Sequence, residues 1–125
     1  MTIATRPPAG ARDRAGRSDA RLVLSTVAVA VLGFAVLVVL PYAVVDFAPP
    51  AGLDWLWSLG GPLALVLAPT AAGLAGCASC VALWRRGDLD ATTRRLHLVA
   101  LVSVATFAVF LASDAGQSVI DWWQD

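Results

Sequence analysis

The stretch LVLSTVAVAVLGFAVLVVLPY, residues 22–42, decides the fold class of this chain. It is apolar throughout except for Ser25, Thr26 and the tyrosine that ends it. As an α-helix rising 1.5 Å per residue, it reaches about 30 Å, which is the thickness of a bilayer's hydrocarbon core. The stretch therefore predicts a membrane-spanning helix over about residues 22–43. Its apolar part is about twice the usual ~7–15 residues of a signal peptide, so we expect a lasting anchor, with cleavage near Asp46 as the alternative.

Two further apolar runs follow, PLALVLAPTAAGLAGCASCVALW at 62–84 and a third over about 96–113. The second run is expected to begin at Pro62, because Gly60-Gly61 interrupts a helix and proline suits a first helical turn. The third run leaves two alternatives, an end near Ala112 or a helical extension to residue 123. The sequence thus predicts an all-α membrane protein with three transmembrane helices, a domain over 22–123 preceded by a tail over 1–21.

Composition and aromatic placement support the same fold class. Hydrophobic residues make up 58% of the chain and charged residues 14%, against roughly 25% charged in soluble domains. A soluble domain of 125 residues could not bury so much apolar surface. Tryptophan and tyrosine favour the membrane–water interface. Those of this chain stand at or beyond the ends of the expected spans: Tyr42, Trp55, Trp57, Trp84, Trp122 and Trp123.

The arginines predict the orientation. All nine basic residues are arginine, five of them before residue 22 and four between the second and third spans, namely Arg85, Arg86, Arg94 and Arg95. Positive residues in short loops stay in the cytoplasm. We therefore expect a multi-pass protein of the plasma (inner) membrane, with its N-terminus cytoplasmic and its C-terminus extracytoplasmic. The tail over 1–21 has little to bury and is predicted to be disordered and basic. Without a basic or aromatic helical face, it predicts no nucleic-acid partner.

Small residues predict how the helices pack. The second span carries a stripe at a constant spacing of four, and the third span has a counterpart. The predicted packing residues are Ala64, Ala68, Ala72, Gly76 and Cys80 in the second span, and Ala100, Ala108, Ala112 and Gly116 in or after the third. Such stripes let helix backbones approach closely in lipid. We expect spans two and three to form an antiparallel hairpin, with the first span more exposed to lipid or reserved for a partner.

Few residues are candidates for chemistry. Cys77 and Cys80 form a C-x-x-C, but they are expected in one helix on the reducing side of the membrane, where packing is the better interpretation. A structural zinc site needs four ligands, and His97 would supply only a third. His97 is interpreted as an interfacial polar residue, with a pH-sensitive contact as the alternative. Asp114 and Gln117 form a candidate polar site only if the third helix continues past Ala112. No catalytic, cofactor-binding or metal site is predicted.

The spans rich in alanine and valine, the absence of lysine and the inner loop WRRG…RRLHL resemble small multi-pass membrane proteins of high-GC actinobacteria. The resemblance is one of style and carries no functional motif. The sequence favours a non-enzymatic accessory, scaffold or regulatory subunit that acts through helix packing. Its expected partners are the lipid bilayer and a membrane protein or a second copy of the chain. The alternatives are a subunit of an oligomeric transporter or channel, and a thiol-redox protein that uses Cys77 and Cys80.

Overall fold

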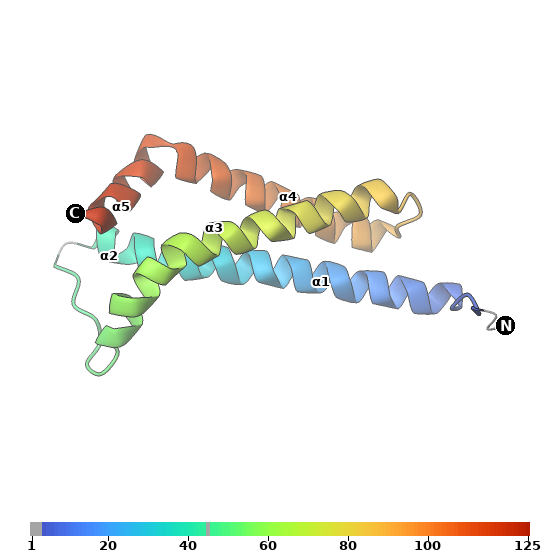
Figure 1. Cartoon of the computed structure of the whole chain (residues 1–125), viewed down its shortest axis with the longest axis horizontal. Helices are drawn as coiled ribbons and strands as arrows, with labels where there is room; N and C mark the ends of the chain where they lie inside the picture. The colour runs from blue at the N-terminus through green and yellow to red at the C-terminus, as the bar shows by residue number, and fades with distance from the viewer. Residues whose placement is uncertain (1–3, 45) are drawn as a thin grey trace.

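The computed structural model describes residues 4–44 and 46–125, and every regular element within them is helical. In chain order these are α1 (Ala9–Phe34), the π-helix η1 (Ala35–Val39), α2 (Leu40–Ala43), α3 (Asp54–Arg85), α4 (Ala91–Ala112) and α5 (Asp114–Gln124). In Figure 1 the long rods lie beside one another, and the short α5 turns away from the end of α4 toward α2. The three rods, Ala9–Ala43, Asp54–Arg85 and Ala91–Ala112, are each long and apolar enough to cross a membrane. The all-helical class and the three candidate spans are confirmed.

The first rod begins earlier than the sequence predicted. Helix α1 starts at Ala9, before the expected span at Leu22, so the structure describes residues 9–21 of the tail as helical. Once a helix is nucleated, each added residue costs little, and alanine and arginine favour the helix. Gly16 and Ala20 in this part are buried against the rest of the molecule. The tail's first residues, 1–3, lie outside the described residues.

The second rod also begins before its predicted start. Helix α3 starts at Asp54 rather than at Pro62, and Gly60 and Gly61 lie inside it. The acidic Asp54 in the first turn complements the partial positive charge of the helix N-terminus. At Gly61 a side chain would meet the indole of Trp123, so this glycine serves tertiary packing instead of ending the helix.

The third rod ends where its apolar run ends. Helix α4 stops at Ala112, and the backbone of Ser113 is extended, with ψ of 160°. The Ser113 hydroxyl then accepts a hydrogen bond from the Gly116 N–H at 3.2 Å and caps α5. A Cβ on Gly116 would lie 2.1 Å from the Phe110 carbonyl oxygen, so the turn requires glycine here. Of the two alternatives for the third span, the structure has the end at Ala112 and a separate helix after it.

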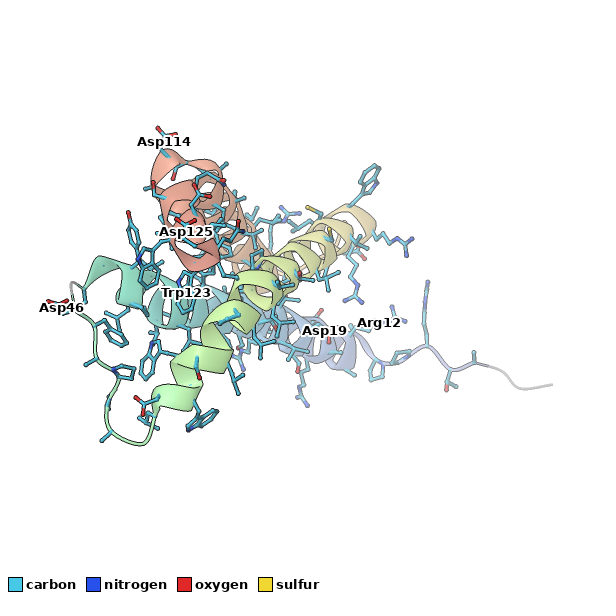
Figure 2. The ribbon with its side chains drawn as sticks, turned by 60° about the vertical axis from the view of Figure 1, so that its left-hand side comes forward. Arg12, Asp19, Asp46, Asp114, Trp123 and Asp125 are labelled. Carbon is cyan, nitrogen blue, oxygen red and sulfur yellow. The ribbon has the colours of Figure 1, made fainter. Side chains whose placement is uncertain are left out.

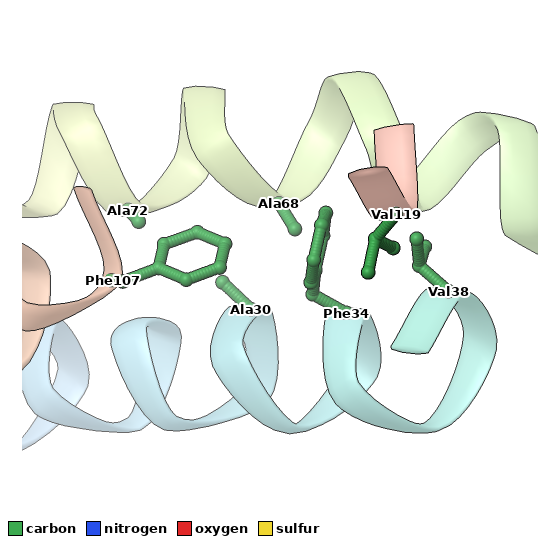
Figure 3. Close-up of a cluster of buried hydrophobic side chains, with 7 residues drawn as sticks. All are labelled: Ala30, Phe34, Val38, Ala68, Ala72, Phe107 and Val119. Carbon is green, nitrogen blue, oxygen red and sulfur yellow. The ribbon is translucent and has the colours of Figure 1, made fainter. Parts of the chain in front are cut away.

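The core includes much of α1, the helix that we expected to be more exposed to lipid or reserved for a partner. Side chains of five helical elements meet there, as Figure 3 shows: Ala30 and Phe34 of α1, Val38 of η1, Ala68 and Ala72 of α3, Phe107 of α4 and Val119 of α5. The rings of Phe34 and Phe107 pack edge to face, with centroids 5.2 Å apart. The two rings occupy the space beside the alanines of α3. Helix α1 is therefore a central packing element, and the prediction of a looser first span is wrong.

Candidate functional site

The predicted packing residues divide into a buried and an exposed set. Ala68, Ala72, Gly76, Ala100 and Gly116 are buried, Ala64 is half-buried, and Cys80, Ala108 and Ala112 are exposed. A Cβ on Gly76 would lie 3.1 Å from Val104 of α4, so α3 and α4 do approach closely at this position. Ala68 and Ala72 also pack against α1. The predicted stripes of α3 and α4 are therefore not in contact along their whole length.

A simple rotation explains why Cys80 leaves the interface. A spacing of four residues advances 400° around an α-helix, so a stripe of this kind drifts by about 40° at each step. The buried positions of α3 are Gly61, Ala68, Ala72, Ala75, Gly76 and Ser79. Among them, Ala68, Ala72, Ala75 and Ser79 are spaced four, three and four. This alternation keeps one face toward neighbouring helices, as in a coiled coil. The sequence carries that spacing, and it would have identified Ala75 and Ser79.

Polar side chains gather at one end of the bundle, where α1 passes the loop between α3 and α4. Asp90 stands at the N-cap position of α4 and accepts hydrogen bonds from the Thr93 hydroxyl and from Nη2 of Arg17 at 3.4 Å. The Thr93 hydroxyl, and next to it the Arg17 guanidinium, hold the pKa of Asp90 below its ordinary value. This contact ties the early part of α1 to the start of α4.

One turn further into the bundle lies a buried polar pair. Nδ1 of His97 in α4 and Oγ of Ser79 in α3 are 3.1 Å apart and share a hydrogen bond. His97 is 3% exposed and Ser79 is 0% exposed. The sequence had interpreted His97 as an interfacial residue, whereas the structure places it between helices. A fully buried hydroxyl cannot reach a substrate, so the pair acts as a link between α3 and α4.

Two cavities flank this end of the bundle and share Arg85 and Arg86. The first, called the polar cavity, has a volume of about 560 Å³ and is lined by Ala9, Arg12, Asp13, Ala15, Gly16, Arg85, Arg86, Asp88, Leu89, Asp90 and Thr93. The second, called the apolar cavity, has a volume of about 480 Å³ and is lined by Asp19, Val23, Cys77, Ala78, Val81, Ala82, Arg85, Arg86 and His97. Figure 2 shows Arg12 and Asp19 on α1 at this end, away from Asp114 and Asp125 at the other.

At the opposite end of the bundle, two tryptophans from other helices donate hydrogen bonds to the π-helix η1. Pro41 has no N–H, and the wider turn of η1 shifts the backbone pairing, so carbonyl groups there need other donors. Nε1 of Trp57 donates to the Val36 carbonyl at 3.2 Å, and Nε1 of Trp123 donates to the Val38 carbonyl at 3.1 Å. In a membrane such freed carbonyl groups must be satisfied within the protein. The sequence had given these rings only an interfacial role.

The remaining candidates stand apart from both groups. Asp114 and Gln117 are exposed on α5, and Nε2 of Gln117 donates to the Leu111 carbonyl at 2.6 Å. They form no site within a span, because α4 ends before them. Cys77 and Cys80 are exposed free thiols. The described residues contain no group of three or more histidine, cysteine or acidic side chains that could hold a metal ion.

Arg85 closes α3 and Arg86 follows it, while Arg94 and Arg95 lie in the first turns of α4, and all four are exposed. Of these four arginines, Arg85 and Arg86 line both cavities, and Arg94 and Arg95 line neither.

Comparison with protein-family models, with curated proteins and with solved structures found no match to this chain. The fold itself therefore defines the class, a helical protein with three candidate membrane spans.

Proposed function

We propose that this chain is a plasma-membrane protein with a cytoplasmic N-terminus and an extracytoplasmic C-terminus, and that it serves as a non-enzymatic accessory or scaffold subunit. The orientation is supported by the nine arginines, which all lie before residue 22 or between residues 85 and 95. The same charge distribution puts the polar and apolar cavities at the cytoplasmic interface. The subunit role is supported by the outer face of α3.

The observation that carries the proposal is an unfilled small-residue face on α3. The chain uses Ala68, Ala72 and Gly76 for its own core, yet Gly73 is exposed, and so is Cys77, which also lines the apolar cavity. A Cβ on Gly73 would meet no other atom within 4 Å. Small residues four apart let a second helix come close in lipid, where van der Waals contact drives association. We infer that a helix of another membrane protein, or of a second copy of this chain, packs here.

The interior of the bundle favours this role over transport and catalysis. Phe34 and Phe107 pack edge to face in the core between the rods, so an apolar contact occupies this part of the interior. No charged residue lies within 22–45, 55–84 or 98–113 of the sequence, whereas transporters place ionisable groups within the membrane. The buried Ser79 hydroxyl is closed to substrates.

Photo-crosslinking in native membranes tests the proposal. A photo-reactive residue replaces Leu74, which is 69% exposed beside Gly73, and in a matched variant it replaces Val109, which is 70% exposed on α4. We expect one discrete protein adduct from position 74, lost on Gly73→Leu, and only lipid adducts from position 109. The mass of the adduct identifies a second copy or another protein. Lipid adducts alone at both positions, or an adduct that survives Gly73→Leu, would contradict the proposal.

A further inference from the structure

The polar and apolar cavities follow one another along α1. The polar cavity touches α1 between Ala9 and Gly16, and the apolar cavity touches it at Asp19 and Val23. Val23 is the second residue of the apolar run that opens at Leu22. The change from polar to apolar lining therefore coincides with the point at which α1 enters the expected hydrocarbon region. An amphiphile with a polar head and an apolar body matches this sequence of linings.

Part of the apolar cavity is suited to the first carbons of an acyl chain. This part is lined by Cys77, Ala78, Val81 and Ala82 of α3 and by Val23 of α1, and the remaining lining residues are Asp19, His97, Arg85 and Arg86. The apolar cavity lies between α1 and the last turns of α3, which end at Trp84 and Arg85. Trp84 is 90% exposed, as expected of a ring in the headgroup region. The shared arginines therefore lie at headgroup depth, with the apolar cavity on the hydrocarbon side of them.

Charges of both signs surround the shared arginines. Three arginines, Arg12, Arg85 and Arg86, and four aspartates, Asp13, Asp19, Asp88 and Asp90, line the two cavities. Asp90 is already paired with Arg17. The remaining charges do not favour a ligand of one sign. They favour a zwitterion whose anionic group meets arginine and whose cationic group meets aspartate.

We propose that the two cavities together bind one phospholipid with a primary-amine headgroup, of the phosphoethanolamine type. The phosphate lies at Arg85 and Arg86, which donate the charge-assisted hydrogen bonds that phosphate oxygens accept. The ammonium enters the polar cavity and donates to Asp13 and Asp88, which line it. The glycerol and the first acyl carbons occupy the apolar cavity. A trimethylated amine has no N–H to donate, so this arrangement discriminates against phosphocholine lipids.

The inference requires only that the chain lies in a membrane, and it holds whether or not the outer face of α3 binds a partner. Native mass spectrometry of the full-length protein tests it. The protein is taken from bilayers that contain phosphatidylethanolamine, phosphatidylcholine and phosphatidylglycerol with identical acyl chains in equal amounts. We expect one retained phosphatidylethanolamine, favoured by about tenfold over phosphatidylcholine, the ratio that one charge-assisted hydrogen bond gives.

Two variants assign the two ends of the headgroup. Arg86→Gln should lower the retention of all three lipids, and Asp88→Asn should reduce retention of phosphatidylethanolamine to that of phosphatidylcholine. Arg94→Gln, an exposed arginine of the same region outside both cavities, is the matched control and should change neither. Circular dichroism confirms that each variant keeps its helices. Equal retention of the amine and choline lipids, preferential retention of the glycerol lipid, or an Arg86→Gln variant that behaves as the wild type would overturn the inference.

Discussion

The contact between Gly61 and Trp123 allows a sharp test of how α5 docks. A Cβ on Gly61 would lie 2.2 Å from Cη2 of Trp123, so Gly61→Ala must displace the indole. Displacement breaks the 3.1 Å hydrogen bond from Nε1 to the Val38 carbonyl. The lost hydrogen bond costs about 1 kcal/mol and the overpacking about 1–2 kcal/mol, against about 1 kcal/mol gained from alanine's helix propensity. We expect a net loss of about 1–2 kcal/mol.

Gly73→Ala is the matched control, because its Cβ would meet nothing within 4 Å in the same helix. It should leave stability unchanged or raise it by up to about 1 kcal/mol. The assay is reversible unfolding by SDS in mixed micelles, followed by circular dichroism. In a Trp123→Ala background the atom that clashes is gone, so Gly61→Ala should lose most of its cost. Equal unfolding of the Gly61 and Gly73 variants, or an undiminished cost without the indole, would refute the packing described here.

Two predictions concern the polar contacts at the arginine-rich end. Ser79→Ala leaves buried His97 without its partner and should lower the free energy of unfolding by about 1–3 kcal/mol in the same SDS assay. Cys80→Ala, at an exposed position, should change it by no more than about 0.5 kcal/mol. Equal effects of the two variants would contradict a buried pair. Because the Thr93 hydroxyl lowers the pKa of Asp90 from 3.8, the stability from its charged form is complete above that value and is lost as the pH falls through the lower folded pKa. The same unfolding assay, repeated from neutral to acidic pH, measures the stability difference between wild type and Asp90→Asn. This difference should be constant down to about pH 5 and then shrink. A difference that shrinks already between about pH 8 and 6 would contradict the lowered pKa of Asp90.

The sequence was most informative where a local property decides the structure. Hydropathy located the three apolar runs, and the end of the third run at Ala112 is also the end of α4. The sequence did not predict the structure where a contact with a residue far along the chain determines it. Gly61 lies inside α3 with the Trp123 ring over it, and Arg17 is tied to Asp90, 73 residues further along the chain. Neither partner can be identified from the local pattern.

The candidate site shows the same division. His97 is the one histidine of the chain, but its partner Ser79 stands between two cysteines, a pattern that indicates redox chemistry or packing through Cys80 and not a buried serine. The alternating spacing through Ala75 to Ser79 was present and would have placed the serine on the inner face. The two cavities could not have been predicted, because they are assembled from α1 and the end of α3.

If the chain crosses the membrane three times, its residues 5 and 125 lie on opposite sides of the bilayer. The most direct measurement labels single cysteines with a membrane-impermeant maleimide in intact cells, in a background where Cys77 and Cys80 are alanine. Thr5→Cys and Asp125→Cys both lie at exposed positions near the ends. We expect Asp125→Cys to be labelled in intact cells and Thr5→Cys only after permeabilisation. Labelling of both variants in intact cells, or of neither, would contradict three spans.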